Sequence, residues 1–477
     1  MADRLLRDLA AQVSPSHALG RPADLAAYAF DAFGASGDRH LPHAVVFPAD
    51  AREVAAVLEV AAHHGLPVIP RGAGTGYSGG AVPTASGGIV LNLARMNRVL
   101  GVEAEAMRIQ AEAGAVTAAV HRRAAEARLY FPPDPGSSST CTIGGNVACN
   151  AAGPHALRYG TTADYLAGAT VVLAGGRVLR LGEGGEPGSE LLRLLPASEG
   201  TLAVITEVIL RVIPAPQTRV TVGAAYASMQ GAADAAARIA EAGLVPAALE
   251  VLDGAALDAI ARSLTDPIAP GAGALVIAEL EGDATAVNAE LEMLRSALEA
   301  AGASDVHTAA DPAEARRLWA ARTAISAAVA RVMVGKVNED VVVPRDRVAE
   351  AVEAARRAGE AERVPVVTFG HLGDGNLHCT FLIDPRLPGE RARGDAAANR
   401  LFEAVLAMGG SITGEHGVGQ TKAGHLERQL GAGTVALMGR IKAALDPRGL
   451  LNPGKKLLPA TAAHRAEAPE PAAAAHH

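Results

Sequence analysis

The sequence predicts an α+β protein with two domains, and three observations support this. First, the chain has 477 residues, a length that suits two or three domains of ordinary size. Second, short strand-like segments alternate irregularly with helix-like segments, unlike a regular βαβ array. Third, Pro214 and Pro216 interrupt this pattern and mark a boundary. We therefore predict a first domain at residues 1–214 and a second at residues 215–440.

The first domain is predicted to open with helices around a Pro/Gly loop, over residues 1–65. Asp50 is a suitable N-cap for the helix in "DAREVAAVLEVAAHHG", which stops at Gly65. The segment "LPVIPRG" then forms a strand that runs into a glycine loop. Further on, a helix is expected in "AVTAAVHRRAAEAR" and strands in "GGIVLNL", "ATVVLAGGRVLRL" and "LAVITEVILRVI".

The second domain is predicted to hold an antiparallel sheet covered by helices. Strands are expected in "TVGAAYAS" and "ALVIAELEG", and helices in "GAADAAARIAEAG" and "TAVNAELEMLRSALEAAG". A hairpin, "VPVVTFGH" to "LHCTFLI", closes the sheet. Residues 441–460, with "LDPRGLLNPGK", are too short for a domain and are expected to return to the first domain. Residues 461–477 are rich in Ala, Pro and Glu and are predicted to be a disordered tail.

Composition excludes several classes of protein. The net charge is −8 and aromatic residues make up 3% of the chain, so neither a basic phosphate-binding face nor a base-stacking platform is indicated, and we expect no nucleic-acid partner. Three cysteines are too few for a disulfide framework or a four-cysteine iron–sulfur cluster. The chain shows no signal peptide and no apolar transmembrane run. We therefore expect a cytoplasmic protein, with any membrane contact peripheral to the inner membrane.

The glycine loop "PRGAGTGYSGG" indicates an anion site. Gly74, Gly76 and Gly79 satisfy the G-x-G-x-x-G pattern of nicotinamide-dinucleotide domains, but a new strand follows them where that fold requires a helix. A glycine loop between two strands can present backbone N–H groups to a pyrophosphate. The alternative is a glycine-rich connector without a ligand. A second long loop, "PPDPGSSSTCTIGGNVACNAAGPHALRYG", and the segment "SEGTLAVITEV" favour the binding interpretation.

These motifs, in this order, resemble the vanillyl-alcohol oxidase and p-cresol methylhydroxylase superfamily of FAD-linked oxidases. Within it, the similarity is greatest to the group of glycolate oxidase FAD subunits and D-lactate dehydrogenases. It covers nearly the whole chain, through "RGAGTGYSGG", "PPDPGSSSTCTIGGNVACNAAG", "ASEGTLAVITEV", "FGHLGDGNLH", "GEHGVG" and "LNPGK". The first domain would then be a two-subdomain FAD-binding domain, and the second a substrate-binding cap.

The resemblance implies a set of FAD-binding residues. They are Arg71, Gly72, Ala73, Gly74, Thr75, Gly76 and Ser78 around the pyrophosphate; Pro135, Thr142, Gly144, Gly145, Ala148, Asn150 and Gly153 along the flavin and adenosine; and Glu199, Gly200, Ile205 and Asn452. For Asn452 the alternative is a simple helix-stop turn. Some superfamily members attach the flavin to a histidine of the first loop. Thr75 stands at the corresponding place here, so we expect non-covalent FAD.

The stretch "FGHLGDGNLHC" places two histidines about an Asp-Gly turn. In a two-residue hairpin turn at Asp374-Gly375, His371 and His378 lie directly opposite each other, so that both imidazoles can reach one ion. The alternative is a surface pair of histidines without a metal. Glu415 supplies a third ligand type, and the resemblance implies the same set: His371, His378 and Glu415 binding a divalent ion, either zinc or manganese.

Oxidation of a 2-hydroxy acid by a flavin requires a base, a hydride acceptor and a carboxylate clamp. His416 is the candidate base because it adjoins Glu415. Arg322 is the candidate clamp, since guanidinium binds carboxylate in a two-point fork, although a solvated helix arginine is the alternative. Lys336 is a second candidate clamp, and Asn376 a candidate hydrogen-bond donor to substrate.

The sequence therefore predicts an FAD- and metal-dependent D-2-hydroxyacid dehydrogenase. D-Lactate or glycolate is favoured over D-2-hydroxyglutarate. Electrons would pass to an external quinone, cytochrome or iron–sulfur subunit, and a homodimer is compatible with the chain. Two alternatives stay open: a metal-dependent hydrolase that uses the same three ligands, and a non-catalytic flavin subunit of a larger complex.

Overall fold

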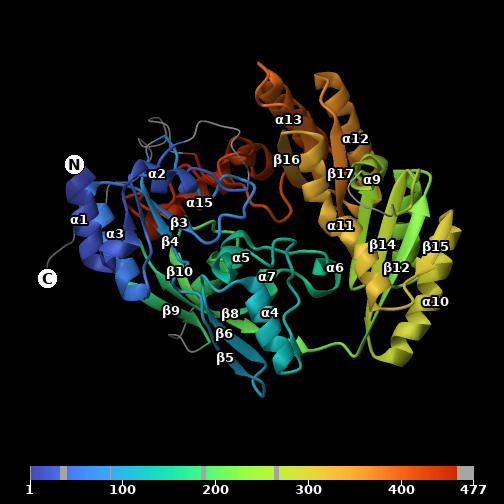
Figure 1. Ribbon diagram of the computed structural model, residues 1–477, viewed down its shortest axis with the longest axis horizontal. Helices are drawn as coiled ribbons and strands as arrows, with labels where there is room; N and C mark the ends of the chain where they lie inside the picture. Colours follow the sequence, from blue (N-terminus) through green and yellow to red (C-terminus); the bar gives the residue numbers. More distant parts are fainter. Residues whose placement is uncertain (1, 33–39, 86, 184–189, 263–267, 459–477) are drawn as a thin grey trace.

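The computed structural model describes residues 2–32, 40–85, 87–183, 190–262 and 268–458. Within these ranges the chain forms two lobes, with the FAD-type glycine loops in one and a large sheet in the other (Figure 1). The predicted disordered tail, residues 461–477, lies outside the described residues.

The first lobe contains two sheets. The smaller has the strand order β1-β2-β4-β3, with β2 and β3 both parallel to β4; the larger is antiparallel, with the order β5-β6-β10-β8-β9. The strands are β1 (Ala18–Leu19), β2 (Ala44–Val46), β3 (Val68–Arg71), β4 (Ile89–Asn92), β5 (Val99–Glu103), β6 (Arg108–Glu112), β8 (Leu166–Val172), β9 (Val178–Gly182) and β10 (Val204–Arg211). Residues 1–65 are thus not purely helical, because two short strands, β1 and β2, add to the first sheet.

The first-lobe helices that precede the second lobe range from four residues in α2, α6 and α7 to 14 residues in α3. They are α1 (Ala2–Val13), α2 (Pro22–Leu25), α3 (Ala51–His64), α4 (Thr117–Glu126), α5 (Ile143–Cys149), α6 (Ala156–Tyr159) and α7 (Thr162–Tyr165). The predicted caps of α3 are confirmed: Asp50 accepts the N–H groups of Arg52 and Glu53, and Gly65 ends the helix with φ +64°. A two-stranded ladder, β7 (Leu129–Tyr130) with β11 (Ile213–Pro214), ends the lobe where the predicted proline boundary lies.

The second lobe is built on one antiparallel seven-stranded sheet, as predicted. Its strand order is β15-β12-β14-β13-β17-β18-β16. The strands are β12 (Thr218–Tyr226), β13 (Ala248–Asp253), β14 (Ala274–Gly282), β15 (Asp305–Thr308), β16 (Gly335–Val342), β17 (Val366–His371) and β18 (Asn376–Ile383). The predicted hairpin is β17–β18, but it does not close the sheet, because β16 pairs with β18 and forms the edge.

The two faces of this sheet are covered differently. One face packs on α8 (Met229–Glu241), α10 (Ala284–Ala300), α12 (Val348–Glu362) and α13 (Glu390–Ala407). The other face packs on α9 (Gly254–Ala261) and α11 (Pro312–Val332) and carries nearly all the buried polar side chains of the sheet. Side chains alternate along a strand, so polar residues at every second position, such as Glu250 and His371, point to this second face, whereas Glu339 and Thr368 point to the first. That face turns toward the first lobe (Figure 1).

The chain returns to the first lobe before the predicted residue 441. The Ser78 hydroxyl donates to the His416 carbonyl, and the N–H groups of Val418 and Gly419 donate to Glu199. Helices α14 (Leu426–Leu430) and α15 (Ala432–Leu445) follow, and Leu451 bridges to Val68 beside β3. In the structure the contact with the first lobe extends over a longer stretch of chain than residues 441–460.

Candidate active site

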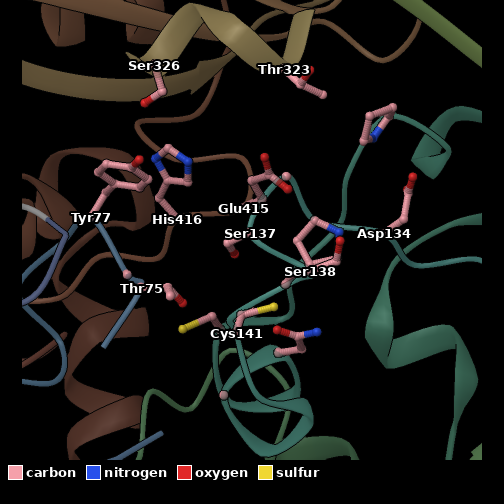
Figure 2. Close-up of a pocket in the computed structure, with 18 of the residues that line it drawn as sticks. Thr75, Tyr77, Asp134, Ser137, Ser138, Cys141, Thr323, Ser326, Glu415 and His416 are labelled. Carbon is pink, nitrogen blue, oxygen red and sulfur yellow. The ribbon is translucent and has the colours of Figure 1, made fainter. Parts of the chain in front are cut away.

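A cavity of about 1180 Å³ lies between the two lobes. The glycine loops of the first lobe form one side, and α11 with β17 and β18 of the second lobe forms the other. In Figure 2, His416 lies between Tyr77 and Glu415, while Thr323 and Ser326 of α11 stand across the cavity from Thr75 and Cys141. Ordinary ligand pockets measure about 300–1,000 Å³, so this one has room for a dinucleotide together with a small substrate.

Most of the predicted FAD-binding residues line this cavity. They are Arg71, Gly72, Ala73, Gly74, Thr75, Gly76, Ser78, Pro135, Thr142, Gly144, Gly145, Ala148, Glu199, Gly200 and Ile205. The geometry fits a large polar ligand: a Cβ added at Gly76 would meet nothing within 4 Å, and Gly74 has φ +71°. The buried Thr142 hydroxyl, at the cavity wall, has no hydrogen-bond partner among the described residues. These features match a site for FAD.

Three residues of that set do not line the cavity. Asn150 ends α5 with φ +54°, and its Oδ1 accepts the N–H of Ala163. Gly153 has φ +120° and packs against the Asp134 carbonyl, where a side chain would collide. Asn452 donates Nδ2 to the Gly80 and Glu199 carbonyls. Their positions support the loops around the cavity from behind.

The histidine hairpin has a different register from the predicted one. His378 pairs with Phe369, and His371 pairs with Asn376, so the two histidines are diagonal neighbours and not directly opposite. The connection comprises residues 372–375, because the N–H of Gly375 bonds to the carbonyl of His371 and extends the turn to four residues. Both imidazoles still share one face of the sheet, and their ring centroids are 5.3 Å apart.

Glu415 completes a cluster whose geometry fits a metal ion. Its Oε1 is 3.3 Å from His371 Nε2 and 3.5 Å from His378 Nε2, and the three ligand atoms all lie within 4.8 Å of one another. Tetrahedral ligands about 2.1 Å from zinc are roughly 3.4 Å apart. Burial raises the pKa of Glu415, but the hydrogen bond and charge of His371 outweigh burial and lower it, so the carboxylate is ionised.

A buried glutamate, Glu250, stands behind this cluster. It lies on β13 directly beside His371 of β17. Its Oε1 is 2.5 Å from His371 Nδ1, and its Oε2 accepts the Nε–H of Arg322 at 2.5 Å. Nothing in the sequence singled out Glu250, because its two partners lie 72 and 121 residues away.

Asp340 holds the loop that carries Glu415 and His416. It is fully buried on β16, and its Oδ2 accepts the N–H groups of Gly414, Glu415 and His416 at 2.6 to 3.0 Å. Lys422 Nζ donates to its Oδ1 at 2.6 Å. Burial raises the pKa of Asp340, but the charge of Lys422 outweighs this and places it well below the ordinary value. The loop is thus fixed by an anion at the edge strand.

His416 is packed between two rings. Its centroid is 5.0 Å from that of His378, nearly parallel to it, and 4.8 Å from that of Tyr77. Its Nδ1 faces Asp340 Oδ1 at 3.7 Å. Burial lowers the pKa of His416, which favours the neutral imidazole. Nδ1 has no hydrogen-bond partner among the described residues, and the tautomer with its proton on Nδ1 directs that proton toward Asp340 and leaves the Nε2 lone pair free.

The three other candidate catalytic residues occupy different places. Arg322 lines the cavity, and its Cζ is 4.9 Å from the centroid of Phe369. Lys336 also lines it, 3.3 Å from the Ser326 hydroxyl and 5.3 Å from the Tyr77 ring centroid. Asn376 is buried and is not among the lining residues: its Nδ2 donates to the Val341 carbonyl. The geometry brings Arg322 and Lys336 to the site and gives Asn376 a structural bond.

A second buried cluster joins the two lobes at the same cavity. His155 donates from Nδ1 to Asp134 at 2.7 Å and from Nε2 to Glu279 of β14 at 2.9 Å. Glu279 and Glu281 also lie close enough to His155 to form a metal-type group. Arg219, however, pairs with both glutamates. The cluster is therefore a network of ion pairs between the lobes, in which two cations, His155 and Arg219, face three carboxylates.

Two parts of the chain match known protein families. Residues 42–182 match the family described as "FAD binding domain", and residues 215–456 match that described as "FAD linked oxidases, C-terminal domain". The glycolate oxidase subunit GlcD of Bacillus subtilis (strain 168) is 37% identical over 418 residues, which cover 87% of this chain and 89% of that protein. The D-lactate dehydrogenase of Anaerostipes hadrus is 33% identical, with 87% and 89% covered.

A third relative and a solved structure extend the comparison. The D-2-hydroxyglutarate dehydrogenase of Xanthomonas citri pv. viticola is 34% identical, covering 87% of this chain and 89% of that protein. The structure of 4-ethylphenol oxidase from Gulosibacter chungangensis superposes with a TM-score of 0.78 over 95% of this chain and 97% of that one, at 21% identity. That likeness confirms the predicted fold. Among the described residues, every helix is too short or too polar to cross a membrane.

Proposed function

This chain belongs to the FAD-linked oxidases, and on that basis we propose its reaction. It oxidises a D-2-hydroxy acid to the 2-oxo acid, with FAD and a divalent ion, and passes the electrons to an external acceptor. D-Lactate and glycolate are the favoured substrates, and D-2-hydroxyglutarate is the third. The three relatives described above are a glycolate oxidase subunit, a D-lactate dehydrogenase and a D-2-hydroxyglutarate dehydrogenase, and so cover all three acids.

The main support for this reaction is the set of chemical groups that line one cavity. The cavity lined by the FAD-type glycine loops also contains a metal-type cluster, a neutral histidine and a half-buried arginine. These are the groups that oxidation of a 2-hydroxy acid requires: a site for an ion beside the hydroxyl, an acceptor for its proton and a cation for the carboxylate.

Arg322 is proposed to bind the substrate carboxylate. Its Nε is held by Glu250, which leaves its two Nη groups as the remaining donors. A guanidinium fixed in this way offers a planar pair of N–H groups to a carboxylate and orients the α-carbon. Lys336, at the cavity wall near Tyr77 and Ser326, adds a second cation to the same wall.

His416 is proposed to take the hydroxyl proton at Nε2. Asp340 faces Nδ1, so the proton-bearing nitrogen points away from the substrate side. The residues that would hold the ion are His371, His378 and Glu415, and a bound divalent ion would polarise the hydroxyl and lower its pKa. FAD, when bound, supplies the acceptor for the hydride of the α-carbon. The substrate thus loses one proton and one hydride in total.

The proposal has two rivals. A metal-dependent hydrolase is disfavoured, because both matched families describe FAD-linked proteins. A non-catalytic flavin subunit would keep the FAD domain without using the metal cluster. That rival is disfavoured by the three convergent ligands and by the neutral His416 beside them.

The test is an anaerobic visible spectrum of the purified protein, with the metal content measured on the same sample. D-Lactate, glycolate and D-2-hydroxyglutarate are added separately, and L-lactate is the stereochemical control. We expect a flavin spectrum that D-lactate or glycolate bleaches, loss of bleaching after chelation, and its return with zinc or manganese. A flavin that none of the acids reduces would support the non-catalytic subunit, and bleaching unaffected by chelation would refute the role of the metal.

A further inference from the structure

Among the described residues, Glu250 is the one buried carboxylate that contacts both a candidate metal ligand, His371, and the candidate substrate clamp, Arg322. It has no solvent exposure, at the middle of β13. One oxygen contacts His371 Nδ1 and the other contacts Arg322 Nε, each at 2.5 Å. Both oxygens are therefore used, and each by a different functional side chain.

The contact with His371 fixes which nitrogen the ring presents to the cavity. A carboxylate on Nδ1 holds a proton there, so Nε2, which faces Glu415, is the nitrogen left to bind a metal ion. Glu250 and His371 are register partners on adjacent antiparallel strands. Their separation is therefore set by the backbone ladder of the sheet, which leaves the imidazole little freedom to rotate.

The contact with Arg322 fixes the guanidinium in the same way. Arg322 comes from α11, which packs on the same face of the sheet as the hairpin histidines, and its Cζ packs over the Phe369 ring. Without Glu250 the head group would keep only this ring contact. Because a fork-shaped donor binds carboxylate best when both N–H groups are already aligned, the orientation of Arg322 affects substrate affinity.

We propose that Glu250 is a positioning residue that holds the metal ligand His371 and the substrate clamp Arg322 in one fixed arrangement. It touches neither substrate nor cofactor. The inference rests on the proposed function, and it extends that function by joining two parts of the site that come from separate elements. It predicts two separable losses when Glu250 is changed, one in metal affinity and one in substrate affinity.

The first experiment measures metal affinity without turnover. Metal-stripped, FAD-loaded wild type and Glu250→Gln are titrated with Zn²⁺ against a chromophoric chelator and with Mn²⁺ by electron paramagnetic resonance. We expect about 10- to 100-fold weaker binding for Glu250→Gln, the usual effect of losing the partner of a ligating histidine. Glu279→Gln is the matched control, because Glu279 is also buried and also bridges a histidine and an arginine. Its metal affinity should stay within about twofold of wild type.

The second experiment tests whether substrate affinity acts through Arg322. KM for D-lactate, or for whichever of the three acids reduces the flavin, is measured in wild type, Glu250→Gln, Arg322→Met and the double variant, at saturating metal. Glu250→Gln should raise KM in the wild-type background and add less than about twofold in the Arg322→Met background, since contacting residues are non-additive. Its effect on metal affinity should persist in both backgrounds.

The outcomes separate this proposal from the proposed function. If wild type binds metal and is reduced by a hydroxy acid, yet Glu250→Gln binds metal as tightly as wild type, the positioning role is refuted. Equal metal losses in Glu250→Gln and Glu279→Gln would also refute it, because they indicate a general loss of packing. If wild type binds no ion, the proposed function fails first, and the role of Glu250 fails with it.

A second variant covers the case in which Glu250→Gln does not fold. Glu250→Asp keeps the buried charge but shortens the side chain by one methylene, so it cannot reach His371 and Arg322 together. It should lose metal affinity or substrate affinity by at least about tenfold while keeping the charge. Wild-type values for both quantities in Glu250→Asp would overturn the proposal.

Discussion

Replacing His155 should weaken the contact between the two lobes in a pH-dependent way. His155 belongs to the FAD-binding lobe and is buried between Asp134 of that lobe and Glu279 of the cap. A neutral imidazole can donate only one hydrogen bond, whereas the charged ring donates to both carboxylates. Burial lowers the pKa of His155, but the two carboxylates outweigh burial and raise it to about 10.

The magnitude and sign follow from this pKa. The rise of the pKa from the ordinary 6.5 to about 10 corresponds to roughly 5 kcal/mol of stabilisation. Because the pKa is raised on folding, the stabilisation is fully present below about pH 6.5 and is lost as the pH rises through about 10. His155→Gln should therefore be destabilised relative to wild type most strongly near pH 6.5, and the difference should shrink toward pH 10.5.

The assay is urea unfolding followed by the fluorescence of the single tryptophan, Trp319. This residue stacks on His155 with a centroid distance of 6.3 Å and donates Nε1 to Glu279, so it reports on the interface directly. Wild type and His155→Gln are compared at several pH values between 6.5 and 10.5, and titrations common to both proteins cancel in the difference. A difference that stays constant or grows with pH would refute the charged-histidine reasoning. Glu279→Gln removes one acceptor, so its loss of stability should begin at a lower pH than that of wild type.

Three further predictions concern the loops around the site. Gly419→Ala should weaken FAD binding by about 5- to 100-fold, because Gly419 has φ +52° and an added Cβ would collide with the Ser78 carbonyl. Equilibrium dialysis measures the FAD affinity, and an unchanged affinity would contradict the prediction. Asp340→Asn should lower kcat by about 10- to 100-fold, because three backbone N–H groups lose their anion and the loop that carries His416 shifts. Asp253→Asn is the control in steady-state kinetics, because Asp253 is a half-buried carboxylate of the same sheet that also accepts backbone N–H groups. Acid precipitation should release all the flavin into the supernatant, since Thr75 stands where some family members carry an attaching histidine, and flavin that stays with the pellet would show covalent attachment.

Local sequence determined the glycine loops, the capped helix α3 and the fact that both hairpin histidines point to the same face of the sheet. Each depends on neighbours within a few residues: a glycine that tolerates positive φ, an Asp that accepts its own helix's N–H groups, and the alternation of side chains along a strand. The family resemblance added the FAD-binding residues and the metal ligands. Of these, Asn150, Gly153 and Asn452 proved to lie behind the cavity wall.

The hairpin register and the hydrogen-bond partners of the site residues depended on the tertiary structure. The Asp-Gly pair predicts a two-residue turn, but the bond from Gly375 to His371 makes it four residues, and the histidines become diagonal neighbours. Glu250, Asp340 and His155 carry no local signal, because their partners come from strands, helices and loops far away in the chain. The amino-acid sequence specifies which side chains are present and where glycine allows backbone conformations with positive φ. Which groups meet depended on strand order and on the packing of one lobe against the other, since a buried charge is stable only beside the partners that the fold brings to it.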